Sequence, residues 1–328
     1  LISTPEEAVA GTTAYLTICF IGIPCITAYN VLASIFRGMG DSRSPMYFIA
    51  AACVVNIGLD FFFMGALRLG PAGAALGTTL SQAVSVLLAL CVILKRKSIR
   101  LSKSDFCPRK ATMKDILSIG LPVAAQDGFI QVSFMLITIM ANQRGLTDAA
   151  AVGIVEKIIS FLFLVPSSML STVSALGAQN IGAGKYDRVD DILRYAIAIG
   201  VGFGAVMALL MQFIAPSMVR PFTSDEAVVL AGAAYIRSYI FDCLFAGIQF
   251  SFSGYFCAWG RSGLSFLHNT LSILLVRVPG AWLACRFFPQ TLVPMGLAPA
   301  CGSLFSSIVC VLLYRWMKRQ NKPTGDKD

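Results

Sequence analysis

Charged residues are scarce in this sequence. Asp, Glu, Lys and Arg together make up 13% of its 328 residues, and 56% of the residues are hydrophobic, whereas soluble domains are about 25% charged. The mean hydropathy is +0.74. This composition excludes an ordinary water-soluble domain, and we infer an integral membrane protein.

Motifs for metals, nucleotides and catalysis are also missing. The ten cysteines form no CxxC pair and have no metal-ligand spacing with His268, the only histidine. We interpret the cysteines as small core residues and His268 as a packing or interfacial residue. The stretch "GAGK" at 182–185 lacks the spacing of a nucleotide-binding loop. No nucleophile and base are paired near a membrane face. We therefore expect no enzyme, no ATP-driven step, no metal other than Na⁺, and no cofactor other than a coupling cation.

Long apolar runs dominate the chain instead. A run of about 20 residues is long enough for a helix that crosses the roughly 30 Å hydrocarbon layer. Nine such runs lie near 8–35, 46–66, 72–94, 116–141, 149–180, 192–218, 227–258, 264–287 and 292–317. The sequence therefore predicts an all-α, polytopic bundle of nine transmembrane helices.

The Lys and Arg residues lie mostly between these runs and indicate the orientation. If Leu1 is outside, the inner connections hold 19 of the 26 Lys and Arg residues and the outer connections hold four. By the positive-inside rule, the C-terminus is then cytoplasmic. The net charge of +9 is explained by this topology and requires no nucleic acid. We expect a multi-pass protein of the cell (plasma) membrane, with the lipid bilayer as its main partner.

A basic segment divides the chain. "KRKSIRLSKSDFCPRKATMKD", residues 95–115, predicts a cytoplasmic linker between an N-terminal lobe of three spans (1–94) and a C-terminal lobe of six (116–318). A cytoplasmic tail (319–328) follows. If the lobes have equal numbers of spans, three helices are missing ahead of the first.

Two weak internal matches support repeated lobes. "IFRGMGDSRS" at 35–44 matches "YFCAWGRSGL" at 255–264, which aligns Gly40 with Gly260. "AGAALGTTLSQ" at 72–82 matches "LAPACGSLFSS" at 297–307, which aligns Gly77 with Gly302. Transporters are often built from such repeats, with the substrate site between them.

The run "VVNIGLDFFFM" at 54–64 contains Asn56 and Asp60, although an acid at the bilayer centre costs roughly 2.5 kcal/mol or more. The two residues are four apart and share one helix face. Thr78 lies at a similar depth on the next predicted helix. Carboxylate, amide and hydroxyl oxygens suit Na⁺, and a carboxylate can also hold a proton. An Asp60 that is capped by a neighbouring helix and does not titrate is the alternative.

Polar residues also interrupt the apolar runs of the C-terminal lobe. A candidate second cation or substrate site consists of Gln126, Asp127, Gln131 and Glu156. For Asp127 and Glu156, ion pairing is an equal alternative. Three other residues favour buried ion pairs, because an unpaired charge in the bilayer is costly: Lys157, Arg237 and Asp242. Arg277 is expected to pair or to snorkel towards the interface.

Four stretches resemble the multidrug and toxic compound extrusion (MATE) transporters. "GAQNIGAGKYDR" at 177–188 is similar to the end of that family's eighth helix, and "GLPVAAQ" at 120–126 to its seventh. "YNVLASIFRGMGDSRSP" at 29–45 and "PAGAALGTTLSQ" at 71–82 resemble its fourth-to-fifth helix junction and its sixth helix. The resemblance covers the whole chain. It implies a fold of two pseudo-repeated lobes, in which these nine spans match helices four to twelve of twelve.

The resemblance also implies a function. The family exports small hydrophobic, often cationic, compounds in exchange for Na⁺ or H⁺ by alternating access, and we expect such a cation-coupled antiporter here, working as a monomer. Asn56, Asp60 and Thr78 match the cation site in the first lobe of some members, and Tyr15 matches a tyrosine of the fourth helix. An aspartate from the first helix completes that site in the family. In the second lobe, Gln131 stands where some members have an acidic ligand.

Two other functions are alternatives. A lipid-linked oligosaccharide flippase of the same superfamily would use cavity cations to bind a pyrophosphate, and Arg237 and Arg277 would suit that role. An inactive truncated transporter or a structural partner would account for three missing helices. The "QNIGAGK" stretch favours the MATE transporter.

Overall fold

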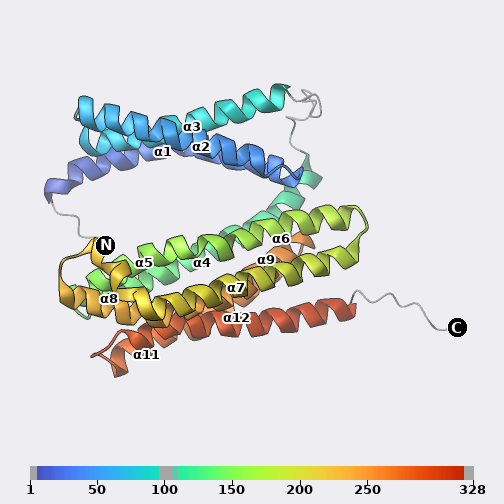
Figure 1. Ribbon diagram of the computed structural model, residues 1–328. Coiled ribbons are helices and arrows are strands. Elements are labelled where there is room, and N and C mark those ends of the chain that lie inside the picture. Colours follow the sequence, from blue (N-terminus) through green and yellow to red (C-terminus); the bar gives the residue numbers. More distant parts are fainter. Residues whose placement is uncertain (1–5, 96–106, 108, 321–328) are drawn as a thin grey trace. The chain divides into compact units, whose positions relative to one another are not determined.

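The computed structural model describes residues 6–95, 107 and 109–320, and all regular elements within them are helices (Figure 1). Nine helical stretches among these residues are long and apolar enough to cross a membrane. The all-α fold and the nine predicted spans are thereby confirmed. The chain is a multi-pass membrane protein.

The chain divides into two compact units, Leu1–Cys107 and Pro108–Asp328. In the N-terminal unit, α3 packs against both α1 and α2 (Figure 1). A small core of aromatic and aliphatic side chains joins the three helices, with Phe36 of α1 edge-on to Phe48 of α2. The elements are α1 (Glu6–Gly38), α2 (Arg43–Asp60), the π-helix η1 (Phe61–Ala66) and α3 (Gly70–Lys95).

The C-terminal unit contains six spans, and three of them are interrupted. The first break, at Phe163, is followed by Pro166, which suits the start of a helix and not its interior. The break at Ile240 has no proline nearby, and the third is a π-helix. The elements are α4 (Lys110–Asn142), α5 (Leu146–Leu162), α6 (Leu164–Gly182), α7 (Tyr186–Val219), η3 (Arg220–Phe222), α8 (Glu226–Tyr239), α9 (Phe241–Ala258), α10 (Ser262–Ser272), η4 (Ile273–Arg277), α11 (Val278–Phe287) and α12 (Val293–Gln320).

These boundaries differ slightly from the predicted ones. Residues 110–115, predicted as the end of the linker, form the first turns of α4, and α12 extends to Gln320. Residues 96–106 of the predicted linker and 321–328 of the predicted tail lie outside the described residues.

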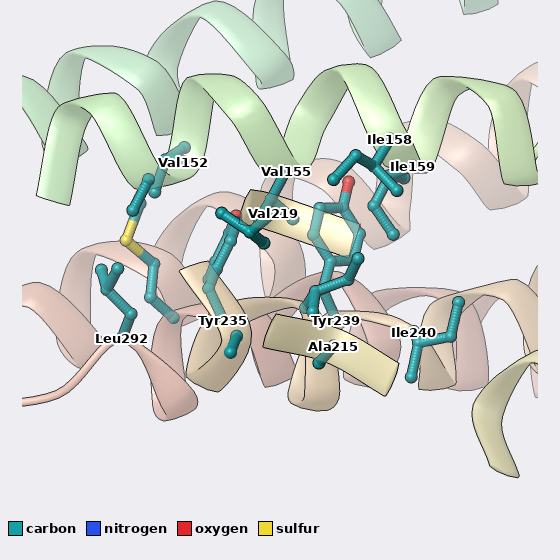
Figure 2. Packing of buried hydrophobic residues seen from close by; sticks show 14 of the residues in the cluster. Val152, Val155, Ile158, Ile159, Ala215, Val219, Tyr235, Tyr239, Ile240 and Leu292 are labelled. Atoms are coloured by element: carbon teal, nitrogen blue, oxygen red, sulfur yellow. The ribbon is translucent and has the colours of Figure 1, made fainter. Parts of the chain in front are cut away.

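The main core of the C-terminal unit surrounds two tyrosines of α8. Figure 2 shows Tyr235 and Tyr239 among aliphatic side chains of α5 and α7, and both tyrosines are almost fully buried. Their neighbours from these two helices include Val152, Val155, Ile158, Ile159, Ala215 and Val219. The hydroxyl of Tyr239 therefore lies inside an apolar core, where it needs a polar partner.

Helices α7 and α9 approach each other closely at glycines. A Cβ added at Gly200 would lie 2.8 Å from Cα of Gly247, and one added at Gly204 would lie 2.6 Å from Cα of Leu244. Small residues allow such close packing between membrane helices. The two backbones are therefore in direct contact, without room for a methyl group.

Gly40 and Gly260, which the sequence aligns, end their helices in the same way. Both have positive φ angles, 84° and 69°. In each case the following N–H donates back into the last turn, from Asp41 to the Phe36 carbonyl (2.9 Å) and from Arg261 to the Phe256 carbonyl (2.8 Å). This is a glycine C-cap. The shared geometry agrees with the repeat seen in the sequence.

Asp190 of α7 joins two other helices near the C-terminal end of α12. Its Oδ1 accepts hydrogen bonds from the hydroxyls of Tyr255 on α9 (3.2 Å) and Tyr314 on α12 (3.1 Å). Its Oδ2 forms an ion pair with Lys318. One carboxylate thus connects α7, α9 and α12.

We expect Asp190→Asn to destabilise the C-terminal unit by about 1 to 3 kcal/mol, because hydrogen bonds to a charged group are stronger than neutral ones. Thermal unfolding in detergent would measure the change. Asp191→Asn is the matched control: the Asp191–Arg194 pair is exposed, with 3.6 Å between N and O, and should contribute little. Equal effects of the two substitutions would contradict the prediction.

Candidate cation site

Asp60 is the last residue of α2 and directly precedes the π-helix η1. Asn56 lies one helical turn earlier on the same helix. Both side chains lie against Gly77 of α3: an added Cβ there would overlap Oδ1 of Asp60 and lie 3.4 Å from Nδ2 of Asn56. The missing side chain of Gly77 therefore makes room for the carboxylate. π-Helices are frequent at functional sites.

Two polar atoms at this place have no hydrogen-bond partner in the described part of the chain. Oδ1 of Asp60 and Nδ2 of Asn56 are buried and accept or donate no hydrogen bond among the described residues. Asp60 also lines an open groove of about 340 Å³, together with Ile57, Phe61, Met64 and Gly65. A buried carboxylate oxygen without a partner is unfavourable. A proton or Na⁺ would satisfy it, and a 180° rotation of the Asn56 amide would present a second oxygen.

Tyr15 and Thr78, the other two predicted members of this site, are more exposed than Asn56 and Asp60. Tyr15 of α1 is 38% exposed and is near enough to Asp60 to interact with it electrostatically. Thr78 is exposed, and its hydroxyl donates to the Ala74 carbonyl of its own helix (3.0 Å). On α3, Gly77 faces Asp60, and Thr78 is rotated from it by about 100°. Sequence reasoning missed Gly77 because a glycine offers no ligand atom.

The four predicted residues of the second site do not form one cluster among the described contacts. Gln126 is buried and accepts a hydrogen bond from Ser265 of α10 (2.7 Å). Asp127 and Gln131 are exposed. The carboxylate of Glu156 on α5 accepts the hydroxyl of Thr138 on α4 (3.2 and 3.3 Å). These residues thus contact different helices.

Arg277 and Asp242 form a buried ion pair in the C-terminal unit. Nη2 of Arg277 is 3.9 Å from Oδ2 of Asp242, and the two residues are 8% and 0% exposed. The same Nη2 donates to the hydroxyl of Tyr239 (3.0 Å), and the guanidinium lies 4.8 Å from the ring centre of Phe134. This pair supplies the partner that the buried Tyr239 hydroxyl needs. Arg277 pairs as predicted.

The other predicted ion pairs are not formed within the described part of the chain. Arg237 is exposed, and its Nε donates to the backbone carbonyl of Gln212 (3.1 Å). Lys157 is exposed and makes no ion pair with a described residue. Pairing is therefore seen for Asp242 and for neither of these two cations. Arg277, one of the two cations that would suit a pyrophosphate site, is buried and already paired with Asp242.

Comparison with known proteins decides the family. The sequence profile described as MatE matches residues 1–62 and 122–283. This chain belongs to the MatE family. The resemblance to MATE transporters found in the sequence is thereby confirmed.

Curated relatives of this MatE protein include multidrug resistance proteins. It is 30% identical over 319 residues to the "Probable multidrug resistance protein YpnP" of Bacillus subtilis, and the alignment covers 96% of this chain and 70% of YpnP. It is 26% identical over 267 residues to the "Multidrug export protein MepA" of Staphylococcus aureus, which covers 80% of this chain and 58% of MepA.

Solved structures show the same fold. A crystal structure of MATE in complex with MaL6 superposes with a TM-score of 0.90 at 21% identity, covering 97% of this chain and 72% of the other. An outward-facing multidrug resistance MATE transporter of the MOP superfamily gives a TM-score of 0.89 at 21% identity, covering 97% and 72%. The MatE chain therefore has the MATE transporter fold.

Proposed function

We propose that this MatE protein exports small hydrophobic, often cationic, compounds across the cell membrane in exchange for Na⁺ or H⁺ bound at Asp60. The observation that carries the proposal is the buried, unpartnered carboxylate oxygen of Asp60 inside a membrane span, next to Gly77 and near Tyr15. The names of the relatives support drugs or other toxic compounds as the substrate class.

The mechanism follows from the position of Asp60 at a helix contact. A cation or proton at Asp60 neutralises a buried charge and changes how α2 packs on Gly77 of α3. The cation thus favours one of the two alternating-access states. A difference of about 1 to 3 kcal/mol in its binding to the two states biases them about 5- to 150-fold.

The C-terminus belongs on the cytoplasmic side under this proposal. Arg315, Lys318 and Arg319 lie at the end of α12, and positive residues near span ends favour the cytoplasmic face. We also propose that the transporter works as a monomer.

Asp60→Asn should abolish cation-driven export. The amide cannot hold a proton and binds Na⁺ weakly, so we expect the export rate to fall by about a hundredfold, or about 2.7 kcal/mol. Ethidium efflux from cells expressing the protein, and from vesicles with an imposed Na⁺ or H⁺ gradient, would measure it. Asp191→Asn, on the exposed face of α7, is the control.

The amount of protein in the membrane should be the same for both variants. Normal export by Asp60→Asn would overturn the assignment of Asp60. No export by the unsubstituted protein would overturn the transport function itself and favour an inactive transporter.

A further inference from the structure

Gly77 and Gly302, which the sequence repeat aligns, occupy similar places in the two units. A Cβ added at Gly77 would meet the carboxylate of Asp60. A Cβ added at Gly302 would lie 3.1 Å from Oγ of Ser272 and 3.2 Å from Cβ of Arg277. A π-helix adjoins the charged residue each time: η1 follows Asp60, and η4 ends at Arg277. In each unit, a glycine of the last helix thus packs on a charged residue at a π-helix, on the carboxylate of Asp60 in one unit and on Cβ of Arg277 in the other.

The sign of this charge differs between the units. In the N-terminal unit, it belongs to a carboxylate whose Oδ1 has no partner. In the C-terminal unit, it belongs to the guanidinium of Arg277, which faces Asp242. Asp242 lies just after the break at Ile240 and is 0% exposed. Neither of its carboxylate oxygens has a close hydrogen-bond partner among the described residues, and the uncharged hydroxyl of Ser303 is near enough to interact with it. Arg277 is therefore the group that compensates the charge of Asp242.

Other titratable groups around Asp242 do not provide a second positive charge. Glu156 of α5 is near enough to interact electrostatically with Arg277. The remaining neighbours of Asp242 that can titrate come from α8 and α9 and are uncharged at neutral pH: Tyr235, Tyr239 and Cys243. Among the described residues, Arg277 thus pairs with Asp242, and Glu156 acts on it through a longer-range electrostatic interaction.

We propose that Arg277 is a built-in cation of the C-terminal unit. It occupies the place beside Asp242 that a proton or Na⁺ would otherwise take. A buried carboxylate must be paired or neutralised, and arginine does not lose its proton in proteins. Because this cation can neither leave nor exchange, Asp242 contributes no exchangeable cation. This inference rests on the proposed function only in assigning cation exchange to Asp60.

The test removes Arg277 in a protein that also lacks the Asp60 carboxylate. Purified Asp60→Asn and Asp60→Asn/Arg277→Met proteins are compared for binding of radioactive Na⁺ and for proton uptake after a pH jump, followed with an indicator dye. We expect the double variant to gain one bound Na⁺ or one proton per molecule. Adding Asp242→Asn should remove this gain. Arg277→Lys, which keeps the positive charge, should show none.

Each outcome bears on the proposal. A folded double variant with no gain, or a gain that survives Asp242→Asn, would overturn it. If Arg277→Met does not fold, Arg277→Met/Asp242→Asn should fold, because both charges are then gone. If Arg277→Met/Asp242→Asn is no more stable than Arg277→Met, the proposal is also overturned. This test does not measure export, so normal export by Asp60→Asn would overturn the assignment of Asp60 and leave this result standing.

Discussion

Gly204→Ala should prevent the C-terminal unit from folding stably. The new methyl group would lie 2.6 Å from Cα and 2.8 Å from N of Leu244, and 2.9 Å from the carbonyl oxygen of Cys243. These are backbone atoms of α9, which cannot rotate away as the end of a side chain can. Helices α7 and α9 would have to separate, and we expect a loss of about 3 kcal/mol or more, at the upper end of overpacking effects.

Gly202→Ala is the matched control for this experiment. Gly202 lies on the same helix, and an added Cβ meets nothing within 4 Å. Alanine favours a helix over glycine by about 1 kcal/mol, so this variant should be as stable as the parent or more so. Thermal unfolding and the monodisperse fraction in detergent would measure both. Similar stability of the two variants would show that α7 and α9 are not in backbone contact.

Gly77→Ala, unlike Gly204→Ala, should retain the fold and lose the activity. Its methyl group would meet Oδ1 of Asp60, the end of a side chain that can rotate. We therefore expect a loss of stability under about 1 kcal/mol. Because the carboxylate is pushed away from α3, cation-driven export should fall by about tenfold or more, equivalent to about 1.4 kcal/mol of lost cation binding.

Gly58→Ala is the control for Gly77→Ala. Gly58 lies on α2 between the two site residues Asn56 and Asp60, and an added Cβ meets nothing within 4 Å. It should keep both stability and ethidium efflux. Full efflux by Gly77→Ala, or unfolding of Gly77→Ala, would show that the space at Gly77 does not serve to position the carboxylate.

The spans could be predicted from the sequence because length and hydrophobicity alone decide whether a helix can cross a bilayer. The interruptions within spans could not. Ile240 lies in a run without proline, and its break depends on how α8 and α9 pack on their neighbours. The π-helices after Asp60 and before Val278 have no composition that distinguishes them from α-helix.

The candidate sites were predictable only within one helix. Asn56 and Asp60 lie four residues apart, which brings them to the same face. The choice of Gly77 over Thr78 depends on the rotation of α3 against α2, and the pairing of Arg277 with Asp242 depends on contacts between separate spans. The depth of a residue along its helix predicts neither the contact at Gly77 nor the pairing of Arg277.

The contacts of His268 with other helices could not be predicted from the sequence either. The sequence predicts a packing or interfacial residue here, and the structure buries it fully, with ring nitrogens bonded to the hydroxyls of Ser253 (3.0 Å) and Ser306 (2.7 Å). The imidazole thereby connects α9, α10 and α12. Serines in an apolar run give no sign in the sequence that they share one histidine.

The contact between Asp190 and Lys318 has a practical consequence for protein engineering. Lys318 lies two residues before the end of α12 at Gln320. Its ion pair with Asp190 of α7 therefore requires nearly the whole length of α12. A fluorescent protein or affinity tag is best joined after Gln320. Shortening the chain before Lys318 to help crystallisation would remove the ion pair with Asp190 and leave its carboxylate with the two tyrosine hydroxyls alone.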